Sequence, residues 1–461
     1  MHLLLRMMTC HSKMDFTDRL EKTFKSVLPT PFTIAVLLTI LTLVLAFFIT
    51  NNTTSNPHYI EILSYWEKGL WNPPLLVFAM QMMLMLVLGH ALALTKSAHK
   101  IIKIMTRFCT NTANAAAIIT FCSLIVSLLN WGLGLIFGAI FARKIGEHFS
   151  KNNIPINYPI IGACGYSGLM VWHGGISGSA PIKIAEEGHF LSDKIGVISQ
   201  AETIFSNMNI AIGLTLIIIL PMVMYIISKV SKEKIISLEK ESKKDIKSNI
   251  SGAEKLDHSK TLSFVFSSTI LIYIFYSAFI LPEKISLKII TPNFINLCLF
   301  SLGLLLHGNF HRYIKSIDSA ISGASGILIQ FPLYFGIMGV MTHSGLIQIM
   351  SDFFVNISNE TTFPLYTFLS AGIVNIFVPS GGGQWAVQGP IIVEAANQLG
   401  VSIPKSIMAL AYGDQLTNML QPFWALPLLG ITGLKAKEIL PYTIILLLIG
   451  SVVFISGLLI Y

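Results

Sequence analysis

Two glycine-rich polar tracts interrupt otherwise apolar sequence, and they carry residue types that can bind a small anion. The first runs from Gly165–Gly168 to Gly174–Ser179, and the second is Pro379–Trp385. Backbone N–H and C=O groups surrounded by hydrocarbon must be hydrogen-bonded, so irregular chain at that depth survives only inside protein or around a cavity. Paired interruptions in two halves of a membrane protein indicate a transporter's binding site.

The second tract has the local chemistry of an anion site. Ser380 to Gly383 precede a predicted helix over 384–396, and the N–H groups at a helix N-terminus attract negative charge. Glycine lets a ligand approach the backbone closely. A flexible turn at the tip of a surface hairpin is the alternative. We predict substrate contacts from Ser380, Gly381, Gly382, Gly383, Gln384 and Trp385.

Lysine and arginine are scarce around both tracts. Between Phe363 and Leu434 the only one is Lys405, at a predicted membrane surface, and the nearest to the first tract is Lys183, at its far end. The sequence therefore predicts no buried cationic clamp, and the dipoles of the backbone are expected to hold the anion.

Asp414 lies in the middle of a predicted span, within the sequence Tyr412–Asn418. A carboxylate at that depth is costly and is a functional candidate by default. It is predicted either to carry a proton or to bind sodium together with Thr417 and Asn418, because sodium prefers oxygen ligands. The alternative is a helix-end aspartate near the surface.

Further contacts are predicted at the other breaks in the chain. The run 418–424 predicts a helix that ends before Pro422, which frees backbone carbonyls. His173 is either an acid–base group or a satisfied hydrogen-bonding side chain. Asn130 and Trp131 form another glycine-rich tip and either serve the site or only cap a hairpin. The remaining predicted contacts are Asn130, His173, Gly174, Gly175, Ser177, Ser179, Gln421 and Trp424.

Composition indicates a membrane protein. Of 461 residues, 53% are apolar and only 12% are charged, against about 25% charged in soluble domains. The net charge of +8 resides in loops beside apolar segments, which favours contact with anionic lipid and argues against nucleic acid. The five cysteines, Cys10, Cys109, Cys122, Cys164 and Cys298, have no metal-ligand or disulfide spacing. No cofactor is predicted, and the expected location is the cell inner membrane, multi-pass, with no cleaved signal.

The apolar runs predict an all-α polytopic fold. The predicted spans are 31–49, 75–94, 157–172, 196–228, 262–281, 290–306, 323–343, 406–430 and 441–461. Two more stretches, 115–142 and 363–396, are predicted to form pairs of short helices that meet at a glycine-rich tip.

Charge selects the threading. If both tips belong to re-entrant hairpins, the basic loops all lie on the cytoplasmic side. Of the 31 Lys and Arg residues, the outside then holds only Lys68, Lys183, Lys194, Lys284, Lys288 and Lys405. The hairpins then enter from opposite sides, so the halves are inverted repeats, each with a discontinuous helix. Matches such as Asn130 with Asn375 and Gly165 with Gly413 agree. The predicted divisions are residues 1–30, an amphipathic cytoplasmic segment; 31–228, the first repeat; 229–260, a charged cytoplasmic linker; and 261–461, the second repeat.

Two other classes of function are alternatives to transport. Gly165–Gly168 fits the GxSG pattern of intramembrane serine proteases, and Ser167, His173 and Asp414 would complete a triad. The same pattern recurs at Gly323–Gly326, and it explains neither the second hairpin nor the inverted halves. A passive channel needs a continuous polar lining, whereas the polar clusters here lie only at mid-depth.

Two motifs, Val378–Pro390 and Gly413–Pro427, closely resemble the bacterial short-chain fatty acid transporter family, and Trp172–Ser179 matches its first-half signature. The likeness extends from about Asp15 to Tyr461. It implies uptake of small monocarboxylates such as acetoacetate and butyrate. It also implies membership of a wider ion-transporter superfamily with paired hairpins and broken helices. That superfamily shows Ser-Asn-Thr tips, whereas this chain has Pro379–Gly383 and Asn130–Gly132.

The sequence therefore predicts a secondary carrier that imports short-chain fatty acids by symport with a proton or sodium. Moving an anion against an inside-negative potential of 100 mV costs about 2.3 kcal/mol per charge, and one co-transported cation cancels that cost. A carrier of another small organic anion, such as a dicarboxylate, is the alternative. The other expected partner is the lipid bilayer, and a homo-oligomer is left open.

Overall fold

The computed structural model describes residues 29–52, 56–238, 251–282 and 286–461. Over these ranges the chain is helical and has no β-strand, only an isolated bridge between Ile156 and Lys234. Seven of the described helices are long and apolar enough to cross a membrane. The predicted all-α polytopic fold is therefore confirmed. The segment 1–30 lies almost wholly outside the described residues.

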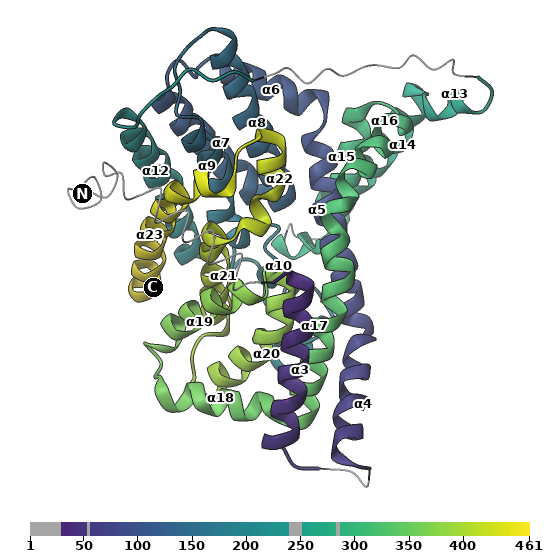
Figure 1. Ribbon diagram of the computed structural model, residues 1–461. Helices are drawn as coiled ribbons and strands as arrows, with labels where there is room; N and C mark the ends of the chain where they lie inside the picture. The colour runs from purple at the N-terminus through teal and green to yellow at the C-terminus, as the bar shows by residue number, and fades with distance from the viewer. Residues whose placement is uncertain (1–28, 53–55, 239–250, 283–285) are drawn as a thin grey trace.

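The first half begins with four helices (Figure 1). Proline at the start of α3 and α5, after the side-chain caps Thr30 and Asn72, fixes where these two helices begin. A glycine-containing contact joins α4 to the later helix α17, since a Cβ on Gly69 would lie 2.3 Å from the carbonyl oxygen of Phe335. The bounds of this group are α3 (Pro31–Ile49), α4 (His58–Leu70), α5 (Pro73–Ala93) and α6 (Lys96–Thr106).

A hairpin and a broken helix complete the first half. Helices α7 (Thr112–Leu129) and α8 (Trp131–Lys151) meet at Asn130 and pack on α9 (Tyr158–Tyr166). After α9 the chain forms 3-10 turns and then the short α10 (Ser179–Lys183), as the glycines there predict. The half ends with α11 (Ser192–Ile195) and α12 (Asn207–Lys229).

The second half repeats the motif of hairpin and broken helix. Helices α19 (Phe363–Phe377) and α20 (Gly381–Leu399) form the hairpin. The broken helix consists of α21 (Ile403–Thr417), a 3-10 turn at Asn418–Leu420 and α22 (Pro422–Thr432). The other helices are α13 (Glu254–Asp257), α14 (Lys260–Phe275), α15 (Pro292–His307), α16 (Phe310–Ile321), α17 (Ser325–Ser344), α18 (Leu346–Ile357) and α23 (Ala436–Ile460).

Close backbone contacts hold each hairpin against its broken helix. A Cβ on Gly138 would lie 2.0 Å from the carbonyl oxygen of Gly165, and a Cβ on Gly413 would lie 2.1 Å from that of Phe368. Only glycine fits at such crossings. In Figure 1 the hairpin α7–α8 lies in the upper half and α19–α20 in the lower half. The inverted repeat and the divisions of the chain stay predictions.

Several element boundaries differ from those predicted. Helix α12 begins at Asn207 and not at residue 196, because 196–199 are irregular, 200–205 form turns and Ser206 caps the helix. The helices α4 and α18 were missed, since each is shorter than a span and amphipathic. The arms α7 and α8, of 18 and 21 residues, are longer than the short helices predicted.

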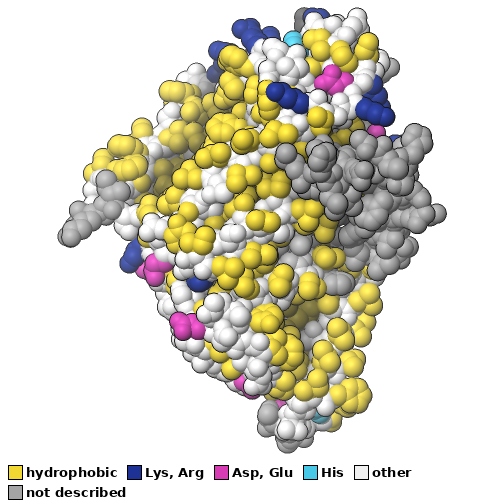
Figure 2. All heavy atoms as spheres, turned by 90° about the vertical axis from the view of Figure 1, so that its left-hand side faces the viewer, with side chains coloured by type: hydrophobic (Ala, Val, Ile, Leu, Met, Phe, Trp, Pro, Cys, Tyr) yellow, Lys and Arg dark blue, Asp and Glu magenta, His cyan; other side chains and the backbone are white. Residues whose placement is uncertain are grey.

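Lys and Arg side chains gather mainly at one end of the molecule, and hydrophobic side chains cover the middle of the face shown in Figure 2. Helix α6 and the end of α8 lie at this end in Figure 1 and bring residues such as Lys100, Lys103, Arg143 and Lys144. This distribution of charge and apolar surface is the one a multi-pass membrane protein needs.

Candidate functional site

Two capped helix starts form the tips of the hairpins. The Oδ1 atom of Asn130 accepts a hydrogen bond from the N–H of Leu133 at 2.7 Å, and the Oγ atom of Ser380 accepts one from the N–H of Gly383 at 3.3 Å. Both residues have the extended backbone of an N-cap. The N–H groups of Gly381 and Gly382 have no acceptor among the described residues. The second tip therefore presents unpaired donors, as an anion site requires.

The second tip lies directly against the broken helices of both halves. A Cβ built on Gly381 would lie 2.7 Å from Trp172, 2.8 Å from His173 and 3.1 Å from the carboxylate of Asp414. Any larger residue would displace this contact. Residue 381 is therefore the point where the tip of one hairpin meets the polar groups of both halves.

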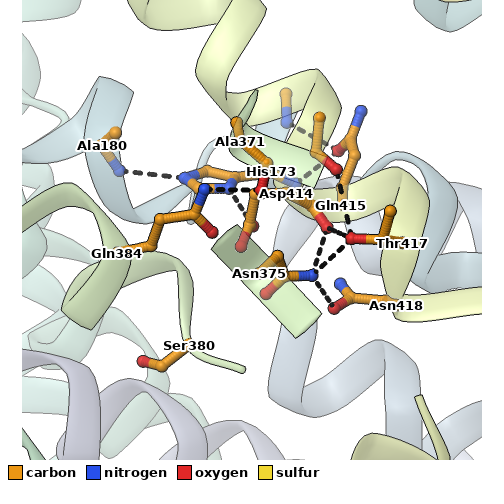
Figure 3. Close-up of polar contacts among 12 residues, drawn as sticks. His173, Ala180, Ala371, Asn375, Ser380, Gln384, Asp414, Gln415, Thr417 and Asn418 are labelled. Carbon is orange, nitrogen blue, oxygen red and sulfur yellow. Dashed lines mark hydrogen bonds and ion pairs between the residues drawn. The ribbon is translucent and has the colours of Figure 1, made fainter. Parts of the chain in front are cut away.

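His173 and Asp414 form a buried pair at this contact (Figure 3). The Nδ1 atom of His173 lies 2.6 Å from Oδ2 of Asp414, and the N–H of Ala180 donates to Nε2 at 3.1 Å. A ring nitrogen that accepts a hydrogen bond carries no proton, so the proton of a neutral His173 is on Nδ1 and is donated to Asp414. The other carboxylate oxygen, Oδ1, is buried and has no partner in the described part of the chain.

Gln415 fixes the backbone around His173. Its Oε1 atom accepts from the N–H of His173 at 2.9 Å and from that of Gly174 at 3.3 Å. The carbonyl of Gly174 in turn accepts from Asn209 at 2.8 Å, and Tyr412 donates to Asn209 at 3.0 Å. The pair is thus held rigidly from both halves of the chain. Sequence reasoning missed Gln415, although it is adjacent to Asp414.

The proposed cation ligands are arranged differently from the prediction. The side-chain nitrogen of Asn375 lies 2.7 Å from the backbone oxygen of Asp414, 3.0 Å from Oγ1 of Thr417 and 3.1 Å from Oδ1 of Asn418. The side chains of Thr417 and Asn418 therefore lie beside the backbone oxygen of Asp414. The carboxylate of Asp414 points away from them to His173 (Figure 3). An amide N–H group sits inside this oxygen cage. The pairing of Asn130 with Asn375 was the one sequence signal for this residue.

A small cavity lies beside the tip. It has a volume of about 20 Å³, which is space for about one water molecule. Two of its lining residues, Trp131 and Trp172, have buried indole N–H groups without a partner among the described residues. Predicted residues on the wall are Ser179, Ser380, Gly381, Gly382, Asn418 and Trp424, and Met82, Leu169, Ile327 and Phe331 were not predicted.

The other predicted contacts lie away from this cavity. Gln384 donates to the carbonyl of Ala371 at 2.9 Å and ties α20 to α19, and Trp385 is wholly buried against Phe190. Ser177 accepts from the N–H of Trp131 and so caps the first tip. Gln421 donates to the carbonyl of Asn375. Gly383 packs against Tyr334, Gly174 against Asn209, and Gly175 against Leu128.

A large vestibule of about 1150 Å³ leads toward the cavity from the basic end. Along α8 its wall runs from Leu135 to Arg143 and Lys144, and Trp424 borders both the vestibule and the small cavity. The ring of Trp424 meets that of Trp131 edge-on, with centroids 5.4 Å apart. Trp424 therefore separates the vestibule from the tip.

The serine-hydrolase interpretation is contradicted by the geometry. The hydroxyl of Ser167 is buried and donates to the carbonyl of Cys164 in its own helix at 2.7 Å, while Nε2 of His173 is taken by Ala180. The histidine has no nucleophile to activate. Lys183, which the sequence places at the far end of the first tract, is only 3% exposed and is paired with Glu186.

Discontinuous helices, glycine-rich tips and an internal vestibule define a membrane transporter and not an enzyme. Residues 14–461 match the family model described as short chain fatty acid transporter, and the chain belongs to that family. A protein of Escherichia coli strain K12, provisionally named a short-chain fatty acid transporter, is 36% identical over 94% of this chain and 96% of its own. A protein of the same provisional name from Haemophilus influenzae is 36% identical over 96% and 98%.

Two solved transporters share the fold. MtrF of Neisseria gonorrhoeae, described as illuminating a class of antimetabolite efflux pumps, superposes with a TM-score of 0.60 at 15% identity, over 97% of each chain. The YdaH transporter of Alcanivorax borkumensis, whose topology is described as unusual, gives 0.54 at 13% identity, over 92% of this chain and 97% of that one. At such identities the likeness concerns the fold alone.

Proposed function

We propose that this protein is a secondary active carrier that imports short monocarboxylates, such as butyrate or acetoacetate, together with a cation. The observation that carries the proposal is the contact at Gly381, where a hairpin tip with unpaired N–H groups touches the buried His173–Asp414 pair. An anion-binding surface and a proton-binding pair thus adjoin at one point.

The substrate carboxylate is proposed to lie against the start of α20. The N–H groups of Gly381 and Gly382 and the indole N–H groups of Trp131 and Trp172 lack acceptors among the described residues, and these four residues border one cavity whose present wall is apolar. A carboxylate supplies the acceptors that they lack, and charge-assisted hydrogen bonds of this kind are the strong ones. The apolar side chains of Met82, Ile327 and Phe331 would surround a short alkyl tail.

The co-transported cation is proposed to be a proton on the His173–Asp414 pair. Both groups are buried, and Oδ1 of Asp414, which has no partner among the described residues, can accept the incoming proton. Protonation of the pair, which lies beside Gly381, would cancel the charge of a carboxylate bound at the tip, which removes the energetic penalty of about 2.3 kcal/mol per 100 mV. Sodium at Asp414, Thr417 and Asn418 is the second candidate, because the oxygens around the nitrogen of Asn375 form a cage of the right chemistry.

The vestibule suggests how the substrate leaves this conformation. Its wall carries Arg143 and Lys144, and the positive-inside rule assigns such a basic end to the cytoplasm of a cell. The conformation is then open toward the inside, with Trp424 between vestibule and tip. Because the cavity at the tip is small, movement of Trp424 or of the tip must accompany binding of an acid.

Reconstituted vesicles test the proposal directly. Uptake of radiolabelled butyrate and acetoacetate is measured under an imposed proton gradient, an imposed sodium gradient, both, or neither. We expect accumulation above equilibrium with the proton gradient, acid outside, and none without a gradient. Accumulation driven only by a sodium gradient would indicate that the co-transported cation is sodium, bound in the oxygen cage. Absence of uptake under every gradient would refute coupled transport of these acids.

A further inference from the structure

Four polar side chains form a cluster on the other side of the tip from the vestibule. The Nζ atom of Lys183 lies 2.5 Å from Oε2 of Glu186 and 3.2 Å from Oε1 of Gln81. The side-chain nitrogen of Gln81 donates to the second carboxylate oxygen, Oε1 of Glu186, at 2.7 Å, and to Asn293 at 3.0 Å. Lys183 and Gln81 therefore hold one carboxylate by both of its oxygens.

The course of α5 places this cluster relative to the site. Phe78 and Gln81 lie near the start of the helix, Met82 borders the tip cavity, and Leu86 and His90 border the vestibule. Gln81 and Met82 are adjacent, so the cluster and the cavity lie at one level of α5, and the vestibule residues follow one and two turns later. The cluster reaches the tip through Phe78, which precedes Gln81, and so from a different level of the helix than the vestibule.

Only one aromatic ring separates Lys183 from the tip. Its Nζ atom lies 5.4 Å from the ring centroid of Phe78, and a Cβ on Gly382 would lie 3.1 Å from Cζ of the same ring. Asn293, at the other end of the cluster, is exposed. The cluster therefore connects the protein surface to the ring that covers the glycine-rich tip.

Lys183 is the only Lys or Arg that is buried in the described ranges, at 3% exposed. Its partner Glu186 retains 15% of its side-chain exposure, and Glu187 beside it is exposed. A buried ammonium group without an anion is strongly unfavourable. Lys183 therefore needs a carboxylate whenever it is shielded from water, and Glu186, at the edge of the cluster, is the group that can turn to solvent.

Building on the proposed function, we propose that Lys183 and Gln81 form a second carboxylate site on the extracellular access path. Glu186 occupies the site in this conformation. A short fatty acid carries the same two carboxylate oxygens, and the neighbouring rings of Phe78, Phe190 and Phe331 offer an apolar surface for its tail. When the outer side opens, the substrate replaces Glu186 on Lys183 and then passes Phe78 to reach the tip.

Sided kinetics test this site. Half-saturation by radiolabelled butyrate is measured separately for external and internal substrate in oriented proteoliposomes. Lys183→Gln is expected to raise the external value roughly tenfold or more, since a charge-assisted hydrogen bond is lost. Glu186→Gln is expected to lower the external value, because the side chain that competes with the substrate for Lys183 loses its charge. Lys183→Gln should leave the internal value within about twofold, because the vestibule reaches the tip without passing the cluster. Glu186→Gln leaves Lys183 without a carboxylate in this conformation, so only its external value is compared.

A matched control and a charge-neutral variant separate binding from stability. Lys194→Gln removes an exposed lysine that pairs with Glu394 at 2.9 Å and should change neither value. Lys183→Gln combined with Glu186→Gln leaves no unpaired buried charge, so it is expected to fold. If it keeps the raised external value, the site is supported. If it restores the wild-type value, the cluster is only structural and the proposal is overturned.

A readout without transport distinguishes this proposal from the proposed function. Asn293→Cys, in a chain whose five natural cysteines are replaced by alanine, places a thiol at the exposed end of the cluster. External butyrate should slow its reaction with a membrane-impermeant maleimide, and should not do so when Lys183→Gln is added. Protection of the thiol without uptake of butyrate would support the second carboxylate site and refute the proposed carrier function. Uptake with no protection would refute the site.

Discussion

The Nδ1 atom of His173 lies 2.6 Å from Oδ2 of Asp414, although the two residues are 241 positions apart in the chain. His173 belongs to the broken helix of the first half and Asp414 to that of the second. The pair therefore joins the two halves at the depth of the tips, and any movement of one half against the other must preserve or break it. Protonation of this pair would therefore be coupled to that movement.

Asp414→Asn is expected to abolish accumulation driven by a proton gradient and to retain exchange of labelled for unlabelled butyrate. An amide can still accept from His173, but it cannot take up a proton. Loss of a charge-assisted hydrogen bond should lower stability by about 1.5–3 kcal/mol. Uptake and counterflow in the same vesicles give the measurement. Asp352→Asn, at an exposed aspartate on α18 that accepts a hydrogen bond from Gln348, is the matched control. Undiminished accumulation in the Asp414 variant would remove this residue from coupling.

Gly381→Ala is expected to stop transport while the protein is still made and inserted. The new methyl group would lie 2.7 Å from Trp172 and 2.8 Å from His173, so the tip must shift away from the pair. Gly213→Ala, on α12, where nothing lies within 4 Å of the added carbon, is the control and should behave as wild type. Detergent-extracted protein is compared by size-exclusion profile, and vesicles by butyrate uptake. Wild-type rates in Gly381→Ala would show that the contact is dispensable.

Asn375→Asp is expected to make transport respond to sodium. The substitution replaces the N–H donor by a carboxylate in a cage of three oxygens, and these repel one another unless a cation enters. Asn375→Leu, which removes donor and acceptor together, should leave buried acceptors unpaired and lower stability by about 1–3 kcal/mol, without sodium dependence. Initial rates are measured in sodium and in choline. If the initial rate of neither variant depends on sodium, the cage does not bind sodium.

The parts of this site that could be predicted are those whose sequence pattern lies close in the chain to the structure it specifies. A helix N-terminus at Ser380–Gly383 was predicted because serine and glycine favour such positions, although α20 begins at Gly381 and not at Gln384. The first span, 31–49, was predicted to the residue because a proline start and an apolar run define it. Both signals lie within a few positions of the element that they describe.

The pairings across the molecule could not be predicted in the same way. A lone histidine and a lone aspartate do not reveal in sequence that they meet, and the carboxylate of Asp414 was assigned to Thr417 and Asn418 because those were its neighbours in the chain. Lys183 was predicted to lie outside the membrane, where lysine side chains are mostly exposed. Glu186 three residues later was the local sign that the charge is neutralised and buried.

Trp424→Ala is expected to shift selectivity toward longer acids. The ring of Trp424 borders both the vestibule and the small cavity and meets Trp131 edge-on. Its removal opens the cavity, which now holds about one water molecule, to further methylene groups of a fatty acid tail. Each methylene that becomes buried contributes about 0.8 kcal/mol, or roughly fourfold in affinity. Competition of labelled butyrate uptake by acids of two to eight carbons gives the profile. We expect the optimum of the variant to lie at a longer chain than that of the wild type, and weaker inhibition by acetate. Leu426→Ala, at an exposed side chain on the vestibule wall, should keep the wild-type profile. An equal loss for every acid in Trp424→Ala would mean that the ring only supports the fold and does not limit the length of the substrate.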